Sequence, residues 1–131
     1  MKLLLDTHIW LWSLVAPSKL TQVVAAHLES RDSELWLSPI TTWEALILIE
    51  KGRIDVQGDP IRWIGEALEA MPFREAALTH AVALESRRLV LPHHDPVDRF
   101  LAASAKVYGL TLVTADERLL GSDEFSVLAN R

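Results

Sequence analysis

Short apolar runs alternate with longer amphipathic segments along this chain. Five runs have the character of buried strands, and they cover residues 2–5, 35–37, 89–91, 110–114 and 125–128. Between them, apolar residues recur at helical spacing, which predicts helices from residue 7 and over residues 18–31, 39–52, 59–71, 75–88 and 95–109. This alternation predicts an α/β domain whose mainly parallel sheet is covered by helices on both faces.

Capping residues and proline mark the starts of several predicted helices. The pairs Ser38-Pro39, Asp59-Pro60 and Asp95-Pro96 each place proline at the first helical position, where its missing N–H costs nothing. Ser18 is expected to cap the second predicted helix. Gly109 is expected to end the helix that begins after Asp95.

Composition narrows the class of protein. With 131 residues, half of them hydrophobic, the chain is expected to form one domain over residues 1–131. No apolar run approaches the length of a membrane span, and the acid at position 6 comes too early for a signal peptide, so a soluble, cytoplasmic protein is expected. Because the chain has no cysteine, any metal ion must be held mainly by oxygen ligands.

The net charge of −5 argues against binding nucleic acid through a broad basic surface. An acidic chain can still act on a phosphate group if its carboxylates are gathered around divalent cations, which invert the local field. Charge alone does not separate this arrangement from an ordinary acidic surface.

Four acids are predicted to converge at one edge of the sheet. Asp6 and Asp116 follow predicted strands, Asp98 lies in the first turn of the helix after Asp95, and Glu44 shares a helix face with aliphatic residues. Ligands of open parallel sheets bind at the carboxyl ends of the strands. Carboxylates gathered there would repel one another without cations, and divalent ions such as Mg²⁺, which takes oxygen ligands, would relieve this repulsion and activate water for phosphodiester hydrolysis.

Plainer interpretations of these residues stay open at this point. Asp95 and Asp98 have the positions of simple capping and helix-dipole residues, and Lys51 is an alternative partner for Glu44. Thr114 could orient a water molecule or phosphate, or could be an ordinary hydroxyl at a strand end. The histidines His8, His93 and His94 lack a paired ligand spacing, so hydrogen bonding in loops is expected of them rather than metal binding.

Four segments in this order resemble PIN-domain proteins of the VapC toxin type. They are Leu3-Leu4-Leu5-Asp6-Thr7-His8, Thr42-Trp43-Glu44, Asp95-Pro96-Val97-Asp98-Arg99-Phe100-Leu101-Ala102-Ala103-Ser104-Ala105 and Leu112-Val113-Thr114-Ala115-Asp116. The resemblance spans the whole chain. It implies a three-layer α/β/α sandwich, an endoribonuclease that depends on Mg²⁺ or Mn²⁺, a cognate antitoxin that holds it inactive, and a homodimer.

The resemblance also assigns roles to individual residues. The four acids of the family, which bind the metal and serve catalysis, fall on Asp6, Glu44, Asp98 and Asp116. Asp95 lies outside this quartet and is expected to cap its helix. Asp95 and Thr114 are both expected to lie next to the metal-binding acids and to support them without binding the metal themselves. The chain departs from the family pattern at Ala115, where a basic residue is often found, which weakens the expectation of a phosphate contact there.

Arg99 and two tryptophans are further candidates for surface contacts. Arg99 points away from the Asp98 face by helical geometry, so we expect it to contact RNA at the rim of the site or to form a salt bridge. Trp10 and Trp12 lie two positions apart on a helix and cannot share a face, so one of them is expected at a dimer or antitoxin interface. The alternative is that all five tryptophans belong to the core.

Two other functions are kept as alternatives to the ribonuclease. One is a PIN-fold interaction module without catalysis, against which the complete acidic set argues. The other is a phosphohydrolase that uses a metal ion on a small substrate, against which the absence of a G-x-x-x-x-G-K loop and of an Asp-x-Asp motif at the first strand argues.

Overall fold

A five-stranded sheet with all strands parallel forms the centre of the molecule. The computed structural model describes residues 1–131 and gives the strand order β3-β2-β1-β4-β5. The strands are β1 (Lys2–Leu5), β2 (Glu34–Leu37), β3 (Arg74–Glu75), β4 (Thr111–Thr114) and β5 (Ser126–Ala129). The two strands at the centre, β1 and β4, belong to opposite ends of the chain, so the sheet joins its two halves.

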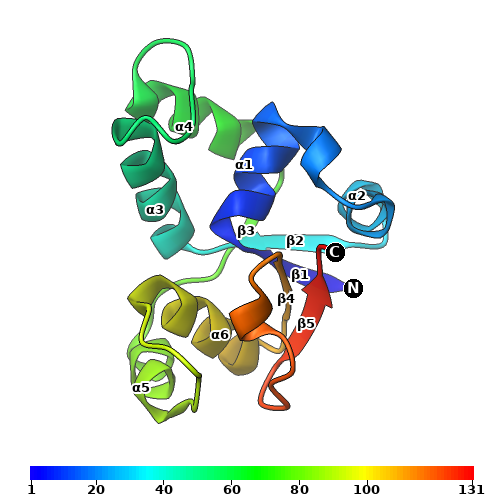
Figure 1. The fold of residues 1–131 in the computed structure, drawn as a ribbon, viewed down its shortest axis with the longest axis vertical. Helices are drawn as coiled ribbons and strands as arrows, with labels where there is room; N and C mark the ends of the chain where they lie inside the picture. Colours follow the sequence, from blue (N-terminus) through cyan, green and yellow to red (C-terminus); the bar gives the residue numbers. More distant parts are fainter.

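Helices cover both faces of this sheet, as the sequence predicts. In Figure 1 the sheet lies between an upper and a lower layer of helices. The upper layer holds α1 (Thr7–Val15), α2 (Gln22–Glu29), α3 (Pro39–Glu50) and α4 (Pro60–Ala70), and the lower layer holds α5 (His80–Arg88) and α6 (Pro96–Tyr108). Two short 3₁₀ helices, η1 (Pro17–Lys19) and η2 (Glu117–Leu119), complete the fold. The expected three-layer α/β/α sandwich is confirmed.

Alternate side chains of β1 point into two separate hydrophobic cores, one on each face of the sheet. Leu3 and Leu5 of β1 pack with Trp10 in the upper core, while Leu4 packs with Leu101 of α6 in the lower core. Because both faces of β1 are buried, the strand is a continuous apolar run rather than an alternating one. No helix of the structure has the length and apolar character that crossing a membrane requires.

Helix α6, which carries Asp98, begins and ends where its local sequence directs. The Asp95 carboxylate accepts hydrogen bonds from the backbone N–H groups of Val97 (3.0 Å) and Asp98 (3.4 Å), so the predicted cap is confirmed. Gly109 follows the helix with a φ of +66°, a left-handed conformation that glycine adopts without steric cost. The first turn of α6 is therefore fixed against the end of the preceding loop.

Three predicted elements differ from the structure. The helix expected over residues 18–31 covers only α2 and is capped by Thr21 rather than Ser18, because Pro17 begins the separate 3₁₀ turn η1. The helix expected over residues 75–88 begins at His80, since residues 74–75 pair with β2 as the edge strand β3. Residues 89–91 form no strand and leave Val90 80% exposed.

Candidate metal centre

The carboxyl ends of β1 and β4 form the edge where the acids gather. After β1 the chain crosses to β2 on one side, whereas β4 lies on the other side, so the connections diverge between these two strands. Asp6 follows β1 directly, and its Oδ1 atom accepts from the Thr7 N–H at 2.6 Å to cap α1. Asp116 follows β4 and caps η2. Local capping thus fixes the backbone of both acids.

All four predicted acids line one pocket. Asp98 enters from the first turn of α6 and Glu44 from the middle of α3. The full lining consists of Asp6, His8, Trp12, Glu44, Asp95, Asp98, Ala115, Asp116 and Arg118. The structure therefore brings together side chains that are as much as 112 positions apart in the sequence.

Thr114 connects two of these acids from the end of β4. Its buried hydroxyl donates to Asp6 Oδ2 at 2.6 Å and accepts from the Asp116 N–H at 3.0 Å. Burial raises the pKa of Asp6, although the hydrogen bonds from Thr114 and from the Thr7 backbone oppose this change. The Thr114 hydroxyl therefore orients one carboxylate and the backbone of the next.

Asp98 is surrounded by three other carboxylates of the pocket. Burial, together with the carboxylates of Asp95, Asp6 and Asp116, raises its pKa from 3.8 to about 8, and Arg118 only partly offsets this. Its Oδ2 atom is buried and has no hydrogen-bond partner. At neutral pH, Asp98 is therefore largely protonated when no cation is bound.

The other two acids differ in exposure and in partners. Partial burial, with a contribution from the Asp6 carboxylate, raises the pKa of Glu44. Lys51, the alternative partner considered for Glu44, takes part in no ion pair. A hydrogen bond from the Arg118 side chain lowers the pKa of Asp116 instead. Arg118 is therefore the only lysine or arginine paired with these acids: it binds Asp116 closely and Asp98 weakly, and Asp6 and Glu44 have no such partner.

These residues fit a Mg²⁺ or Mn²⁺ ion. The donor set consists of carboxylate oxygens, which both ions prefer. The unpartnered Asp98 Oδ2 atom is a buried acceptor that a cation would satisfy. A bound cation would also relieve the repulsion that raises the pKa of Asp98.

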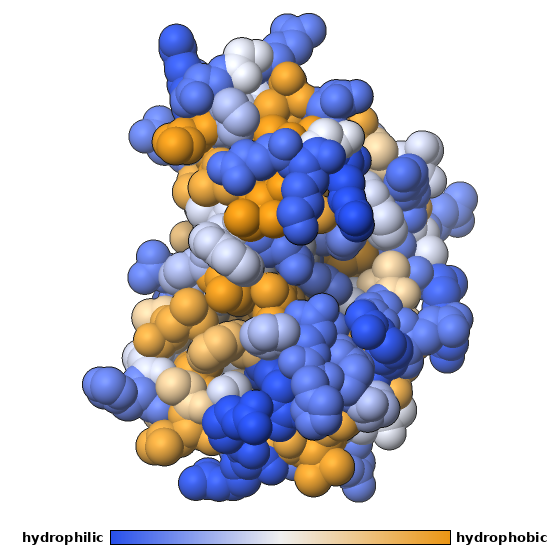
Figure 2. Space-filling model, turned by 60° about the vertical axis from the view of Figure 1, so that its left-hand side comes forward, coloured by the Kyte–Doolittle hydropathy of each residue, from blue (hydrophilic) through white to orange (hydrophobic).

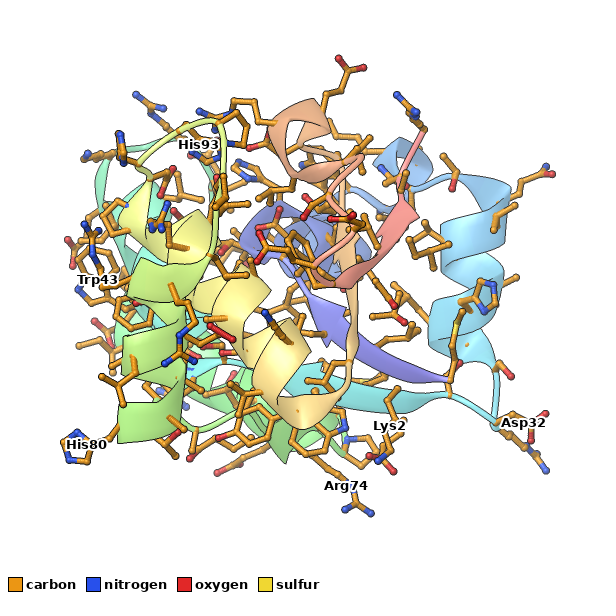
Figure 3. The ribbon with its side chains drawn as sticks, turned by 90° about the horizontal axis from the view of Figure 1, so that it is seen from below. Lys2, Asp32, Trp43, Arg74, His80 and His93 are labelled. Carbon is orange, nitrogen blue, oxygen red and sulfur yellow. The ribbon has the colours of Figure 1, made fainter.

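His93 lies close to this set, at a position from which it could share a metal ion with Asp98 and Asp116. Its Nε2 atom lies 3.5 Å from Asp98 Oδ2, and ligand atoms of His93, Asp98 and Asp116 fall within 4.8 Å of one another. Its Nδ1 atom accepts from the Asp95 N–H at 3.3 Å, so in the neutral ring the proton is on Nε2. Figure 3 shows His93 in the loop before α6. The structure thus shows the hydrogen bond in a loop that the sequence predicts for this histidine, but it also places His93 among the possible metal ligands.

The structure corrects two predictions of surface contacts. Arg99 is buried, because its Nε donates to the Ser86 carbonyl at 2.7 Å and its Nη2 to the Leu89 carbonyl at 2.6 Å, so it reaches no RNA-facing rim. Trp10 is fully buried and packs edge-on against Phe73, which excludes it from an interface. Trp12 is half-buried at the pocket, where its ring lies near His8 and Lys19.

Arg118 is the residue of the site that the sequence analysis missed. It follows Asp116 by two positions, and its guanidinium donates to both carboxylate oxygens of that acid. The spacing of an arginine two residues after a capping acid was the available signal. It did not stand out because the orientation of the side chain depends on the 3₁₀ turn η2.

The stability of the metal-free protein is expected to fall as the pH rises from about 5 to 8. A carboxyl whose folded pKa is raised binds its proton more tightly in the folded chain, so the resulting stabilisation is lost as the pH approaches the folded value of about 8. We expect the free energy of unfolding to fall by about 2 to 4 kcal/mol. This is less than the full change in pKa would give, because the pocket is open to water, which screens the repulsion between the charges. Asp116, whose pKa is lowered, changes stability only in more acidic solution.

Urea unfolding in chelator at several pH values measures this trend. Addition of Mg²⁺ should reverse it, because deprotonation of Asp98 strengthens metal binding. A free energy of unfolding that rises from pH 5 to 8 in chelator would contradict the prediction.

Comparison with known proteins identifies the family to which the sequence of this chain is related. The family model described as PIN domain matches residues 3–122. The chain is 32% identical over 119 residues to Ribonuclease VapC22 of Mycobacterium tuberculosis, covering 88% of each chain.

Two solved structures have the same fold as this chain. One is VapBC2 from Rickettsia felis bound to a DNA fragment from its promoter, with a TM-score of 0.70 at 13% identity over 98% of each chain. The other is FitAcB from Neisseria gonorrhoeae, with a TM-score of 0.67 at 21% identity over 98% of this chain and 97% of that chain. At these identities the structures establish the fold alone.

Proposed function

The chain belongs to the PIN-domain family, and from this premise we propose that it is a metal-dependent endoribonuclease, the toxin of a toxin–antitoxin pair. The observation that supports this most directly is the pocket at the carboxyl ends of β1 and β4, where Asp6, Glu44, Asp98 and Asp116 converge from four segments of the chain. Its similarity to Ribonuclease VapC22 indicates RNA as the substrate. An RNA-cleaving toxin acts where RNA is made and translated, so the proposal includes the cytoplasm as its location.

Each residue of the pocket has a distinct part in this proposal. Asp6, Glu44, Asp98 and Asp116 would hold Mg²⁺ or Mn²⁺, and Asp95 and Thr114 would support them. When bound, such an ion lowers the pKa of water and offsets the charge of the phosphodiester. The chain itself need supply no nucleophile, so its side chains act by holding the cation and by orienting the carboxylates.

Hydrogen bonds from neighbouring residues pre-orient the site. Asp95 accepts from the Asp98 N–H and fixes the first turn of α6. The Asp6 carboxylate accepts from the Thr114 hydroxyl at one oxygen and from the Thr7 N–H at the other. In the metal-free protein at neutral pH, Asp98 is largely protonated, so it must release its proton when the ion binds. Metal binding is thus coupled to proton release at this carboxyl.

The direct test is cleavage of a panel of structured RNAs by protein free of antitoxin. We expect discrete products with Mn²⁺ or Mg²⁺ and none with chelator. Asp32→Asn is a matched control, because Asp32 is exposed and lies on the far side of the molecule from His93 in Figure 3. Hydrolysis of small phosphate esters without RNA cleavage, or metal-independent products, would contradict the proposal.

Thr114→Val is expected to weaken Mn²⁺ binding by about tenfold, which is the usual loss of affinity when a residue that orients a metal ligand is removed. The valine keeps the shape of threonine but removes the hydrogen bond to Asp6 Oδ2. Isothermal titration with Mn²⁺ measures the change, and Thr111→Val at the other end of β4 is a control. Equal affinities of Thr114→Val and the parent chain would show that the hydroxyl does not support the site.

An apolar surface beside the pocket is the proposed contact for the antitoxin. It is lined by Pro39, Ile40, Trp43, Leu78, Pro96 and Val97. Figure 2 shows several such apolar areas, in orange, on the side of the molecule that faces left in Figure 1. Ile40 and Trp43 lie on α3, which carries Glu44, and Pro96 and Val97 begin α6, which carries Asp98, so the same two helices form this surface and part of the acidic pocket.

Trp43→Ser is expected to raise the dissociation constant for the cognate antitoxin by at least about tenfold, since large aromatic residues dominate interface energies. Trp43 is 55% exposed and projects outward in Figure 3, so its loss should leave the fold intact. Ile61→Ser, at an exposed position of α4, is the control. Titration of the purified antitoxin measures both, and unchanged binding of Trp43→Ser would argue against this surface.

A homodimer is also proposed, from the similarity to toxins of this family. Trp12 remains a proposed contact of the second copy or of the antitoxin, because its ring is half-buried at the pocket rim. Light scattering of the purified protein measures its assembly. A monomer at all tested concentrations would contradict the dimer.

A further inference from the structure

One positively charged side chain, that of Arg118, is bound to carboxylates that are proposed to hold the metal. The Arg118 Nε donates to Asp116 Oδ1 at 3.1 Å, and Nη2 donates to Asp116 Oδ2 at 2.8 Å. The same Nη2 lies 3.6 Å from Asp98 Oδ2. Arg118 therefore spans two of the four acids, and it is the only lysine or arginine that lines the pocket.

A guanidinium and a divalent cation cannot both use these oxygens. The ligand atoms of Asp98 and Asp116 lie within 4.8 Å of each other, close enough for one ion to contact both. Such an ion would need the Asp116 lone pairs that now accept hydrogen bonds from Arg118, and the two positive charges would repel each other. The ion pair must therefore loosen when a metal ion binds.

Arg118 is anchored in a way that allows this movement. Its backbone N–H donates to Asp116 Oδ1 at 2.9 Å and is fixed in the short helix η2. Its side chain is 56% exposed and has no partner besides the two acids. The guanidinium can therefore leave Asp116 while its Cα stays at the rim of the pocket.

A released guanidinium at this rim has one evident ligand. The chain is acidic, with a net charge of −5, and no other arginine or lysine lines the pocket. A guanidinium binds phosphate through two parallel N–H···O bonds, in the geometry that Arg118 now uses toward Asp116.

We propose that Arg118 is an exchangeable counter-ion of the site, which holds Asp116 and Asp98 until a metal ion displaces it and then positions the RNA phosphate beside that ion. The inference rests on the proposed ribonuclease function. Arg118 lowers metal affinity in the resting protein and raises affinity for RNA once the metal is bound. In the resting protein, Arg118 therefore competes with metal ions for these two carboxylates.

Two variants separate the two parts of this role. Arg118→Met removes the charge but keeps a long side chain, and Arg118→Lys keeps the charge without the planar fork. Arg62→Met is the matched control, since Arg62 is an exposed arginine of α4 paired only with Glu66. Because the Arg118 pair is exposed, its loss should leave the fold intact, which thermal unfolding in chelator checks.

The first measurement is Mn²⁺ binding by calorimetry without RNA, with the parent chain and all variants compared at the same pH. We expect Arg118→Met to bind Mn²⁺ about tenfold more tightly than the parent chain, because a neighbouring positive charge is removed. Arg118→Lys should lie between the two. Equal or weaker binding by Arg118→Met would overturn the counter-ion role.

The second measurement is cleavage kinetics at saturating Mn²⁺. We expect Arg118→Met to raise KM for RNA by about tenfold with a smaller change in kcat, and Arg118→Lys to recover part of the loss, because a point charge replaces part of the bidentate contact. An unchanged KM in Arg118→Met would overturn the positioning role. If the parent chain neither binds Mn²⁺ nor cleaves RNA, the ribonuclease proposal fails and this inference fails with it. If it does both and Arg118→Met behaves like it, only this inference fails.

Discussion

Asp98→Asn is expected to lower RNA cleavage by at least about a thousandfold while making the metal-free protein more stable. A metal ion contributes several kcal/mol to the stabilisation of the transition state, and each 1.4 kcal/mol changes the rate about tenfold. Asparagine keeps the shape of the side chain but offers one weak oxygen in place of a carboxylate. The variant should therefore lose the stabilisation by Mg²⁺ that the parent chain shows.

The gain in stability follows from the position of Asp98 among other acids. Ionising Asp98 in the folded protein is costly, since its pKa is raised to about 8 by burial and by the carboxylates of Asp95, Asp6 and Asp116. A neutral amide avoids this cost. We expect a gain of about 2 kcal/mol in the free energy of unfolding at pH 8, and a smaller gain at pH 5, where Asp98 is already protonated.

Urea unfolding at both pH values, with and without Mg²⁺, measures this prediction beside RNA cleavage. Asp32→Asn removes an exposed carboxylate and should change neither property. A folded Asp98→Asn variant that retains metal-dependent cleavage would exclude Asp98 from the site. A variant less stable than the parent chain in chelator at pH 8 would show that Asp98 is not under the expected repulsion.

Arg99→Ala is expected to destabilise the protein by about 3 kcal/mol. This loss is larger than the sequence suggests, because the helical pattern predicts that Arg99 lies on a face exposed to solvent. Its guanidinium donates to the carbonyls of Ser86 and Leu89 at the C-terminal end of α5. A positive charge there satisfies orphan carbonyls and interacts favourably with the helix dipole. Alanine would leave those carbonyls without donors and would open a cavity between α5 and α6.

The same substitution tests how the site is supported. The loop after Leu89 leads to His93 and Asp95, so a loosened α5 end should also lower metal affinity, by a smaller factor than Asp98→Asn. Arg87→Ala, at an exposed position of the same helix, is the control and should cost little. Equal stabilities of Arg99→Ala and Arg87→Ala would contradict a structural role for Arg99.

The convergence of the acids could be predicted because it follows from topology. Asp6 and Asp116 are far apart in the sequence, yet each directly follows an apolar strand, and parallel strands end at the same edge. Asp98 was found from the cap at Asp95, and Glu44 from a carboxylate on an apolar helix face. These signals are local and require only the fold class in addition.

The environments of single side chains could not be predicted in this way. Helical geometry correctly separates Arg99 from the Asp98 face but does not show that α5 covers the other face. It separates Trp10 from Trp12 without showing that Trp10 enters the upper core. In both cases the partner comes from a segment that the local pattern does not include.

The sequence by itself determined the alternation of strands and helices, the caps of α3, α4 and α6, and the set of acids, because these depend on local periodicity and on the chemistry of single residues. Only the tertiary structure decided that Arg118 holds Asp116 and reaches Asp98, that His93 turns its Nε2 toward Asp98, and that residues 74–75 rather than 89–91 join the sheet. Those outcomes depend on how separate segments pack and on which buried groups find partners, and these are properties of the whole folded chain.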